Sequence, residues 1–292
     1  LVGLWLVDLW QRSAMPADVA LVELGPGRGT LMADIRRVLA RVPELAAAPV
    51  HLVETSPVLA ACQRERHPDA RWHDDIATLP ADRPLLIVAN EFFDALPIRQ
   101  LVRAADGWRE RMVGLAAAGF APVPGPARVD PLVPADLRDA PVGSIFEASP
   151  AGVSIMKALA SRIVGQGGAV LAIDYGYGRP GIGDTLQAVS AHAFADPFAD
   201  PGEVDLTAHV DFAELGGAAT RGGARVHGPA SQGDWLRALG LAVRVQRLAV
   251  ANPDQAAAVR EQAARLADAD RMGSLFKVMA ACAPGWAVPA GL

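Results

Sequence analysis

The sequence of 292 residues contains only two cysteines, Cys62 and Cys282, which lie far apart and among apolar neighbours. This scarcity excludes a disulfide framework and a thiolate metal centre, and it fits a reducing cytoplasm. Basic residues are also in deficit, because 27 Lys and Arg stand against 32 Asp and Glu, which gives a formal net charge of −5. Without a basic surplus the chain has no field that attracts a nucleic-acid backbone, so we expect no nucleic acid as partner.

Long hydrophobic runs are missing too. The longest one, near residues 1–9, is broken by Asp8 and falls short of the ~20 residues that a membrane-spanning helix needs, so no stable membrane insertion is expected. The chain opens at Leu1 without methionine or a targeting signal, and we interpret it as a polypeptide truncated at its N-terminus. What is present, 51% hydrophobic and 20% charged residues, is typical of a globular protein with a large core.

Apolar runs and amphipathic segments alternate along the chain, which predicts a mostly parallel, doubly wound α/β sheet. We expect residues 1–292 to form a single domain, with an insertion at 98–145 and a cap region at 176–230 over the carboxyl edge of the sheet. The expected strands are 19–24, 51–54, 85–90, 169–174 and 276–281, and the expected helices are 1–9, 31–42, those opened by Ser56-Pro57 and Ser149-Pro150, 210–219 and 255–266.

The turn after the first expected strand carries the strongest chemical signal. Gly25, Gly27 and Gly29 occupy alternate positions, which permits tight geometry and lets a ligand approach the backbone. Glu23 ends the strand just before them. An acid there repels a pyrophosphate but attracts the ammonium and sulfonium groups of S-adenosylmethionine. The pattern favours S-adenosylmethionine over NAD as cofactor, and a purely structural glycine turn is the alternative.

Acidic residues follow the next two expected strands. Glu54 stands about 30 residues beyond the glycine turn, where a carboxylate can accept both ribose hydroxyls, as it also does in NAD enzymes. Asp74 or Asp75 is placed to receive the adenine amino group, although either is equally compatible with a solvated turn.

Two acids and two aromatics follow the strand 85–90. Asn90 ends it on the cofactor side, and Glu91 and Asp94 flank Phe92 and Phe93. Paired carboxylates can hold a guanidinium through fork-like hydrogen bonds while an aromatic ring packs on its flat face. This pattern indicates an arginine acceptor. The alternative is that one acid caps the next segment and both rings fill the core.

A histidine between two acids, His209 with Asp205 and Asp211, completes the set of candidate residues. His209 could relay a proton, but a single histidine near a helix start is more often structural. No Cys or His partner stands at ligand spacing, so no metal is expected.

Together these segments resemble the MidA family of S-adenosylmethionine-dependent class I methyltransferases, and the resemblance extends over nearly the whole chain. It implies a Rossmann-like sheet with an inserted cap subdomain. It also adds Glu147 as an acceptor-side acid. The matching segments are 23–30, 53–57, 90–97, 146–150, 173–176, 183–186, 200–202, 205–212, 228–233 and 272–277.

The resemblance further implies a protein arginine methyltransferase, bacterial and cytoplasmic or located in the mitochondrial matrix, whose mitochondrial members act in complex I assembly. Glu23, Gly25, Gly27 and Gly29 would hold the methionine part of the donor and Glu54 its ribose, while Glu91 and Asp94 would face an arginine-bearing client protein. A Gly-Asp-Phe segment usual at the start of the family is absent, which puts donor affinity in question. The alternatives are a donor-binding assembly factor or chaperone, a small-molecule methyltransferase and a nicotinamide-dependent oxidoreductase.

Overall fold

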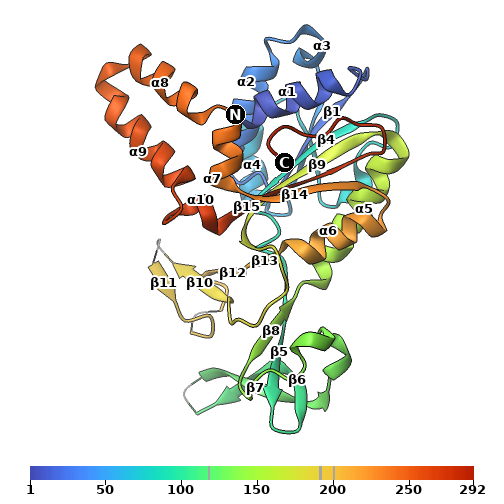
Figure 1. Ribbon diagram of the computed structural model, residues 1–292, viewed down its shortest axis with the longest axis vertical. Helices are drawn as coiled ribbons and strands as arrows, with labels where there is room; N and C mark the ends of the chain where they lie inside the picture. Colours follow the sequence, from blue (N-terminus) through green and yellow to red (C-terminus); the bar gives the residue numbers. More distant parts are fainter. Residues whose placement is uncertain (118, 191–192, 200) are drawn as a thin grey trace.

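The computed structural model describes residues 1–117, 119–190, 193–199 and 201–292. Over these residues the main sheet has eight strands, in the order β14-β15-β9-β4-β1-β2-β3, with β13 paired to the end of β9. Strands β1, β2, β3, β4 and β9 run parallel, and β15 is antiparallel to β9. The chain starts in the middle of the sheet and winds outward in both directions, which confirms the predicted doubly wound α/β fold (Figure 1).

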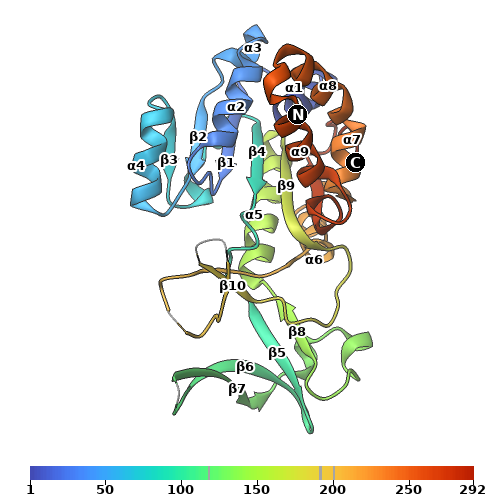
Figure 2. The same cartoon turned by 90° about the vertical axis from the view of Figure 1, so that its left-hand side faces the viewer.

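The elements fall into the main body, two small sheets and a C-terminal helical group (Figure 2). The helices are α1 (Val2–Arg12), α2 (Thr30–Leu39), α3 (Pro43–Ala46), α4 (Pro57–Arg66), α5 (Pro150–Gln166), α6 (Phe212–Arg221), α7 (Gln232–Ala238), α8 (Leu241–Ala251), α9 (Ala256–Ala267) and α10 (Met272–Leu275). The strands of the main sheet are β1 (Ala20–Leu24), β2 (Val50–Val53), β3 (Arg71–His73), β4 (Leu85–Asn90), β9 (Gly168–Tyr177), β13 (Val210–Asp211), β14 (Arg225–Ser231) and β15 (Phe276–Cys282). The short 3-10 helices are η1 (Ile76–Thr78), η2 (Asp130–Leu132), η3 (Ala135–Leu137) and η4 (Pro253–Gln255).

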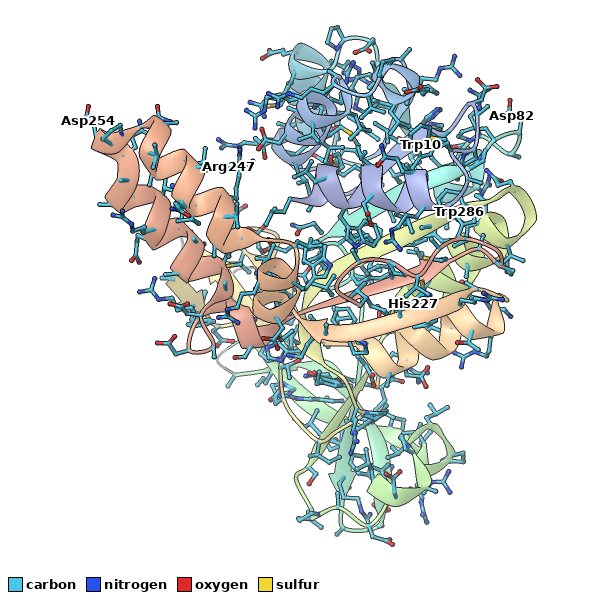
Figure 3. All side chains as sticks on the ribbon, turned by 45° about the horizontal axis from the view of Figure 1, so that its top comes forward. Trp10, Asp82, His227, Arg247, Asp254 and Trp286 are labelled. Atoms are coloured by element: carbon cyan, nitrogen blue, oxygen red, sulfur yellow. The ribbon has the colours of Figure 1, made fainter. Side chains whose placement is uncertain are left out.

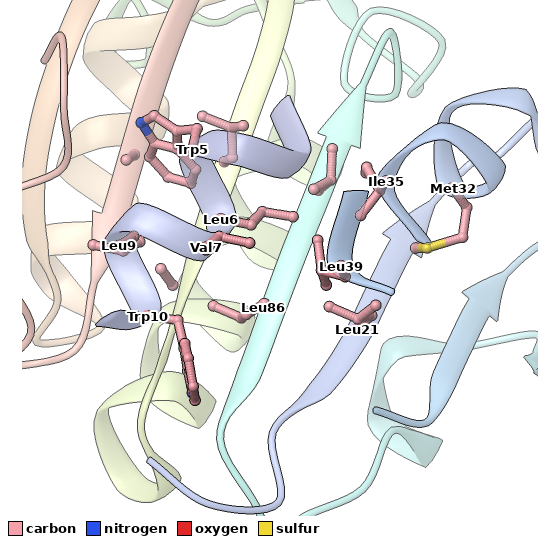
Figure 4. Packing of buried hydrophobic residues seen from close by; sticks show 14 of the residues in the cluster. Trp5, Leu6, Val7, Leu9, Trp10, Leu21, Met32, Ile35, Leu39 and Leu86 are labelled. Carbon is pink, nitrogen blue, oxygen red and sulfur yellow. The ribbon is translucent and has the colours of Figure 1, made fainter. Parts of the chain in front are cut away.

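The core has two halves, one on each face of the main sheet. Alternate residues of each central strand enter opposite halves, because successive side chains of a strand point to opposite faces. In β1, for example, Leu21 joins the half formed with α1, α2 and α7, whereas Val22 joins the half formed with α5 and α6. Figure 4 shows Trp5, Leu6 and Ile35 packed over the first half. Both faces are therefore covered, which explains why these strands read as continuous apolar runs.

Two smaller sheets lie beyond the carboxyl ends of the parallel strands (Figures 1 and 2). One joins β7, β6, β5 and β8 in that order, and the other joins β11, β10 and β12. Segment 115–141, which the composition predicts as an excursion at the edge of the main sheet, instead contributes to the separate four-stranded sheet. The bounds are β5 (Arg99–Ala104), β6 (Gly107–Ala116), β7 (Gly119–Arg128), β8 (Ile145–Ala148), β10 (Gln187–Ser190), β11 (Ala193–Ala195) and β12 (Asp205–Thr207).

The hairpin of β6 and β7 is exposed and carries no charge from residue 112 to residue 127. Leu115 and Val113 are 85% and 61% exposed, and Phe120 is 51% exposed. Strand β7 forms the free edge of its sheet, and proline stands at every second position in it, at Pro122, Pro124 and Pro126.

Helices α8 and α9 pack against each other and project from the main body; Figure 3 labels Arg247 on α8 and Asp254 in η4, which connects the two helices. Neither α8 nor the edge strand β14 is predicted from the sequence pattern. Across the described residues, no helix has the length and apolar character needed to cross a membrane.

Candidate active site

The glycine turn lies at the carboxyl end of β1, where it enters α2. Gly25, Gly27 and Gly29 all have positive φ, between 54° and 71°, a region that glycine adopts without steric cost. The Gly25 amide donates to the Val53 carbonyl of the neighbouring strand at 3.0 Å. A Cβ atom placed on Gly27 would meet no atom within 4 Å. At Gly27 the turn therefore presents its backbone to open space, as backbone recognition of a ligand requires, while Gly25 and Gly29 face Phe92 and His67.

Gln63 of α4 and His67, the residue that caps the C-terminus of α4, hold this turn in place, and neither is predicted as a site residue. The buried Gln63 donates to the Gly27 carbonyl at 2.7 Å and to Glu54 at 3.0 Å, and accepts from Trp72 at 2.9 Å. His67, also buried, hydrogen-bonds the Gly29 carbonyl at 2.8 Å. Gln63 and His67 are four residues apart, and so lie on one helix face. Two polar residues on the buried face of a helix are the signal that could have revealed them.

Glu54 follows β2 and faces the glycine turn through Gln63. Its Oε1 atom accepts from the Ser56 amide at 2.8 Å and its Oε2 atom accepts from Gln63 at 3.0 Å. Each carboxylate oxygen can accept a further hydrogen bond. Glu54 is therefore fixed in orientation and keeps acceptor capacity for a ligand.

Asp74 and Asp75 follow β3 and differ in the hydrogen bonding and exposure of their carboxylates. Asp75 accepts from the Ala77 amide at 2.7 Å and so caps η1. Asp74 is exposed at the carboxyl edge. Of the two, Asp74 is therefore the one whose carboxylate is not used as a helix cap.

Glu23 is nearly enclosed, with 3% of its surface exposed. Its Oε2 atom has no hydrogen-bond partner within the described part of the chain. Burial raises the pKa of Glu23 to about 8, and a backbone hydrogen bond from Met32 offsets only part of this rise. An unpaired, buried carboxyl group beside a glycine turn is ready to receive a cationic ligand group.

The turn after β4 is held by a residue of the neighbouring strand. Asp174, fully buried on β9, accepts through Oδ2 from the consecutive amides of Phe92, Phe93 and Asp94 at 3.0 to 3.2 Å. Its Oδ1 atom accepts from the Tyr175 amide at 3.1 Å. Burial and the nearby Asp94 charge raise the pKa of Asp174 to about 8, while these amide bonds act in the opposite direction. One carboxyl group thus fixes the turn that carries both candidate acceptor acids.

The acids of this turn face different surroundings. Glu91 is exposed, has a φ of 50°, and lies 3.4 Å from the Asn90 side-chain nitrogen. Partial desolvation and the Asp94 charge raise its pKa. Asp94 is 6% exposed, and burial raises its pKa although a side-chain hydrogen bond from Tyr175 lowers it. The structure therefore leaves Glu91 open to solvent and encloses Asp94 beside Tyr175.

Phe92 and Phe93 meet edge to face, with ring centres 5.2 Å apart. Phe92 lies over the glycine turn, because a Cβ on Gly25 would be 3.0 Å from its ring. Phe93 is buried in the core half formed with α5 and α6. Phe92 also packs against this core half, so its ring lies between the glycine turn and the core.

Glu147 and His209 lie away from the glycine turn. Both oxygens of the buried Glu147 are occupied, by Gln100 at 2.6 Å, by the Thr185 and Leu186 amides at 3.0 and 3.2 Å, and by the Thr185 hydroxyl. The His209 ring stands edge-on to Tyr175 at 5.4 Å, and burial lowers its pKa. Glu147 thus ties segment 184–186 to β5 and β8, with three hydrogen bonds to its Oε1 atom and one to its Oε2 atom.

The structure brings the candidate donor-side residues Glu23, the three glycines and Glu54 to the carboxyl ends of β1 and β2, and the candidate acceptor-side residues Glu91 and Asp94 to the turn after β4, which pairs with β1. Asn90 ends β4, and Asp74 follows β3. Asp200 of the segment 200–202 lies outside the described residues. In the described part of the chain no three His, Cys, Asp or Glu side chains are grouped as metal ligands.

Comparisons with known proteins give this geometry a chemical context. Residues 1–230 match a family model described as "putative S-adenosyl-L-methionine-dependent methyltransferase". The chain is 33% identical to the mitochondrial protein arginine methyltransferase NDUFAF7 homolog of Drosophila melanogaster, over 96% of this chain and 71% of that protein. It is 32% identical to the mitochondrial protein arginine methyltransferase NDUFAF7 of Xenopus tropicalis, over 95% and 71%.

Two crystal structures from Burkholderia thailandensis have the same fold. One superimposes with a TM-score of 0.86 at 26% identity, covering 99% of this chain and 79% of that one. The other, bound to S-adenosyl-homocysteine, gives a TM-score of 0.84 at 27% identity over 99% and 77%.

Proposed function

This chain belongs to the family of S-adenosyl-L-methionine-dependent methyltransferases, and on that premise we propose that its methyl acceptor is the side chain of an arginine in a client protein. The observation that carries the proposal is the exposed carboxylate of Glu91 on a turn fixed by Asp174. The relatives named protein arginine methyltransferases support it.

The donor side fits S-adenosylmethionine, whose sulfonium supplies an electrophilic methyl group when bound. Glu23 offers an unpaired carboxyl oxygen for the ammonium group. The space in front of Gly27 leaves room for backbone contact, and the fixed Glu54 retains acceptor capacity for ribose hydroxyls. The exposed Asp74 completes this set on the adenine side.

The acceptor side works by positioning. A guanidinium held by Glu91 has its charge drawn toward the nitrogens that face the carboxylate, which leaves the remaining nitrogen directed at the donor side. Phe92, which lies over Gly25, supplies an aromatic face between the two sides. The buried Asp94 does not reach the acceptor in this arrangement. Its charge raises the pKa of Glu91, and its hydrogen bond with Tyr175 holds it in place. The raised pKa of Glu91 suits it to take up the proton that the methylated nitrogen releases.

The identity of the client, a bacterial cytoplasmic or mitochondrial matrix location, and a role in complex I assembly remain predictions. So do the bounds of the insertion at 98–145 and of the cap region at 176–230, and the role of His209 as a proton relay. The exposed, uncharged β6–β7 hairpin supports a large partner over a small-molecule acceptor, since exposed apolar patches mark interaction sites.

The test supplies the purified chain with methyl-labelled S-adenosylmethionine and arginine-bearing peptides and proteins, and locates the transferred methyl group by mass spectrometry. We expect methyl-arginine. Gly27→Val should abolish donor binding, because a branched side chain fills the space in front of the turn and is strained at φ 54°. Glu91→Gln should lower turnover by about 100-fold and leave donor affinity unchanged, with the exposed Glu44→Gln as control.

Two results would contradict the proposal. One is label on a residue other than arginine or on a small molecule alone. The other is an equal loss of donor affinity and turnover in Glu91→Gln, which would assign Glu91 to the donor.

A further inference from the structure

A cavity of about 450 Å³ lies between the first turns of α5 and α6 and the β5–β8 sheet. Figure 1 shows these elements meeting where the four-stranded sheet joins the main body. The volume falls within the usual range for ligand pockets in proteins. The donor-side residues Glu23, Gly27 and Glu54 do not line it, so it is separate from the donor site.

The lining of this cavity is mainly apolar. Several of its polar side chains are already engaged with the chain itself. Glu147 accepts four hydrogen bonds, as described above, and the Ser149 hydroxyl lies between the Pro97 carbonyl and the Gly152 amide, at 3.3 and 3.2 Å. Asp211 caps α6 through Oδ1, which accepts from the Ala213 and Glu214 amides, while its buried Oδ2 has no partner among the described residues. The apolar lining includes Phe93, Ile98, Leu132, Phe146, Val153 and Leu215.

One wall of the cavity is the acceptor turn itself. Phe93 lines the cavity and stands two residues from Glu91. Their Cα atoms are therefore at most about 7 Å apart. His209, which stands edge-on to Tyr175, lines the same wall. A single stretch of polypeptide can thus place one side chain at Glu91 and another in the cavity.

We propose that this cavity binds an apolar side chain, of leucine or phenylalanine size, from the polypeptide that carries the methyl-accepting residue. The proposal rests on the proposed function in one respect, that the acceptor is a protein. A free metabolite is oriented by several polar groups, whereas most of this lining is apolar. A peptide side chain needs none, because its own main chain orients it.

The distance between the two subsites sets the sequence preference. An extended peptide rises about 3.3 Å per residue, so a residue two to four positions from the acceptor residue reaches past the two-residue span from Glu91 to Phe93. Each well-filled apolar subsite discriminates by about 10- to 100-fold. We therefore expect peptides with leucine or phenylalanine at that spacing to bind about 10-fold or more tightly than peptides with serine there.

The experiment uses Gly/Ser peptides with one arginine and one leucine placed one to eight residues away. Binding is measured by fluorescence anisotropy with S-adenosylhomocysteine present, and KM is measured in parallel. A second peptide set replaces arginine with citrulline. Tighter binding at two to four residues supports the cavity. If the citrulline set keeps the leucine preference while no arginine is methylated, the cavity assignment stands and the arginine assignment fails.

Variants locate the effect in the cavity. Val153→Phe fills it from α5 and should erase the leucine preference while leaving S-adenosylhomocysteine affinity unchanged. Val288→Phe, at a 60% exposed position outside the lining, is the matched control. Leu132→Ser removes apolar lining at a half-exposed position and should weaken the preference without the risk of misfolding that a core change carries.

The proposal fails if leucine gives no advantage at any spacing in the unchanged protein. It fails equally if the advantage survives in both Val153→Phe and Leu132→Ser, since the side chain is then bound elsewhere. If Val153→Phe loses donor binding or unfolds at a lower temperature than the unchanged protein, the effect of Leu132→Ser on the leucine preference is the deciding result.

Discussion

Glu23 shows at the scale of one residue how burial tunes a group toward its ligand. With its pKa raised to about 8, the side chain is mostly protonated at neutral pH in the free protein. A cation bound beside it favours the charged form and lowers that pKa again. Binding of a cationic donor must therefore release a proton.

A pH titration of donor affinity tests this coupling. Because Glu23 must lose its proton, affinity for S-adenosylmethionine should rise from pH 6 to pH 8 by up to about tenfold per pH unit, and level off above pH 8. Calorimetry in buffers of different ionisation enthalpy counts the proton released. Glu23→Gln should bind more weakly and without this slope. An unchanged slope in the variant would assign the proton to another group.

At the scale of elements, the acceptor turn depends on the strand beside it. Asp174→Ala removes the acceptor of the three consecutive amides at Phe92, Phe93 and Asp94, each of which is then left unpaired. We expect kcat/KM for the acceptor to fall by about 10- to 100-fold, with donor affinity changed much less. Steady-state kinetics and donor calorimetry on the same preparations separate the two effects.

The exposed Asp254→Asn in η4 serves as the control for that loss. If Asp174→Ala unfolds at the same temperature as the unchanged protein and keeps full kcat/KM, Asp174 is not a positioning residue.

The sequence predicts those elements whose pattern is complete in one segment. Strand 85–90 is confirmed as β4 (Leu85–Asn90), and the helix opened by Ser149-Pro150 is confirmed as α5, with the Ser149 side chain as its cap. Both have a continuous apolar run or stripe and a clear end signal. Strand β14 has neither, because it is an edge strand that contains Gly228 and Pro229.

The site is predictable where the backbone or a single charge defines it, as at the glycine turn and Glu23. It is not predictable where distant segments share one hydrogen-bond network. Asp174 stands 80 residues beyond Asp94 in the sequence. Gln63 owes its contact with Gly27 to the packing of α4 beside the turn. Likewise, the enclosure of Asp94 and the hydrogen bonds of Glu147 to Gln100 and Thr185 follow from tertiary packing that local pattern does not encode.

At the scale of the whole molecule, a pair of histidines makes the free energy of unfolding depend on pH. His51 on β2 is 2% exposed, and its Nδ1 lies 2.8 Å from Nε2 of His73 on β3. Burial, together with the charges of His73, Arg71 and Arg83, lowers the pKa of His51 to about 4. The charge of Asp82 acts in the opposite direction and is the smallest of these effects. The folded protein therefore holds His51 neutral at a pH where the unfolded chain binds a proton.

The free energy of unfolding should consequently fall as the pH drops from about 6.5 to about 4, since over this range only the unfolded state takes up the His51 proton. Urea unfolding at a series of pH values measures this slope. His51→Gln, which can still donate to His73, should show a shallower slope over the same range. Equal slopes for both proteins would remove His51 as the cause.

The three alternate prolines of β7 affect how readily copies of the chain aggregate through this edge strand at high concentration. Alternate residues of a strand point their backbone nitrogens to the same side, and proline carries no N–H group, so Pro122 and Pro124 remove two donors from one side of β7. An apolar ribbon with a complete edge would template cross-β stacking. The β6–β7 hairpin can therefore contact a partner through its apolar side chains, while the missing N–H donors of β7 disfavour backbone pairing with another copy of the chain.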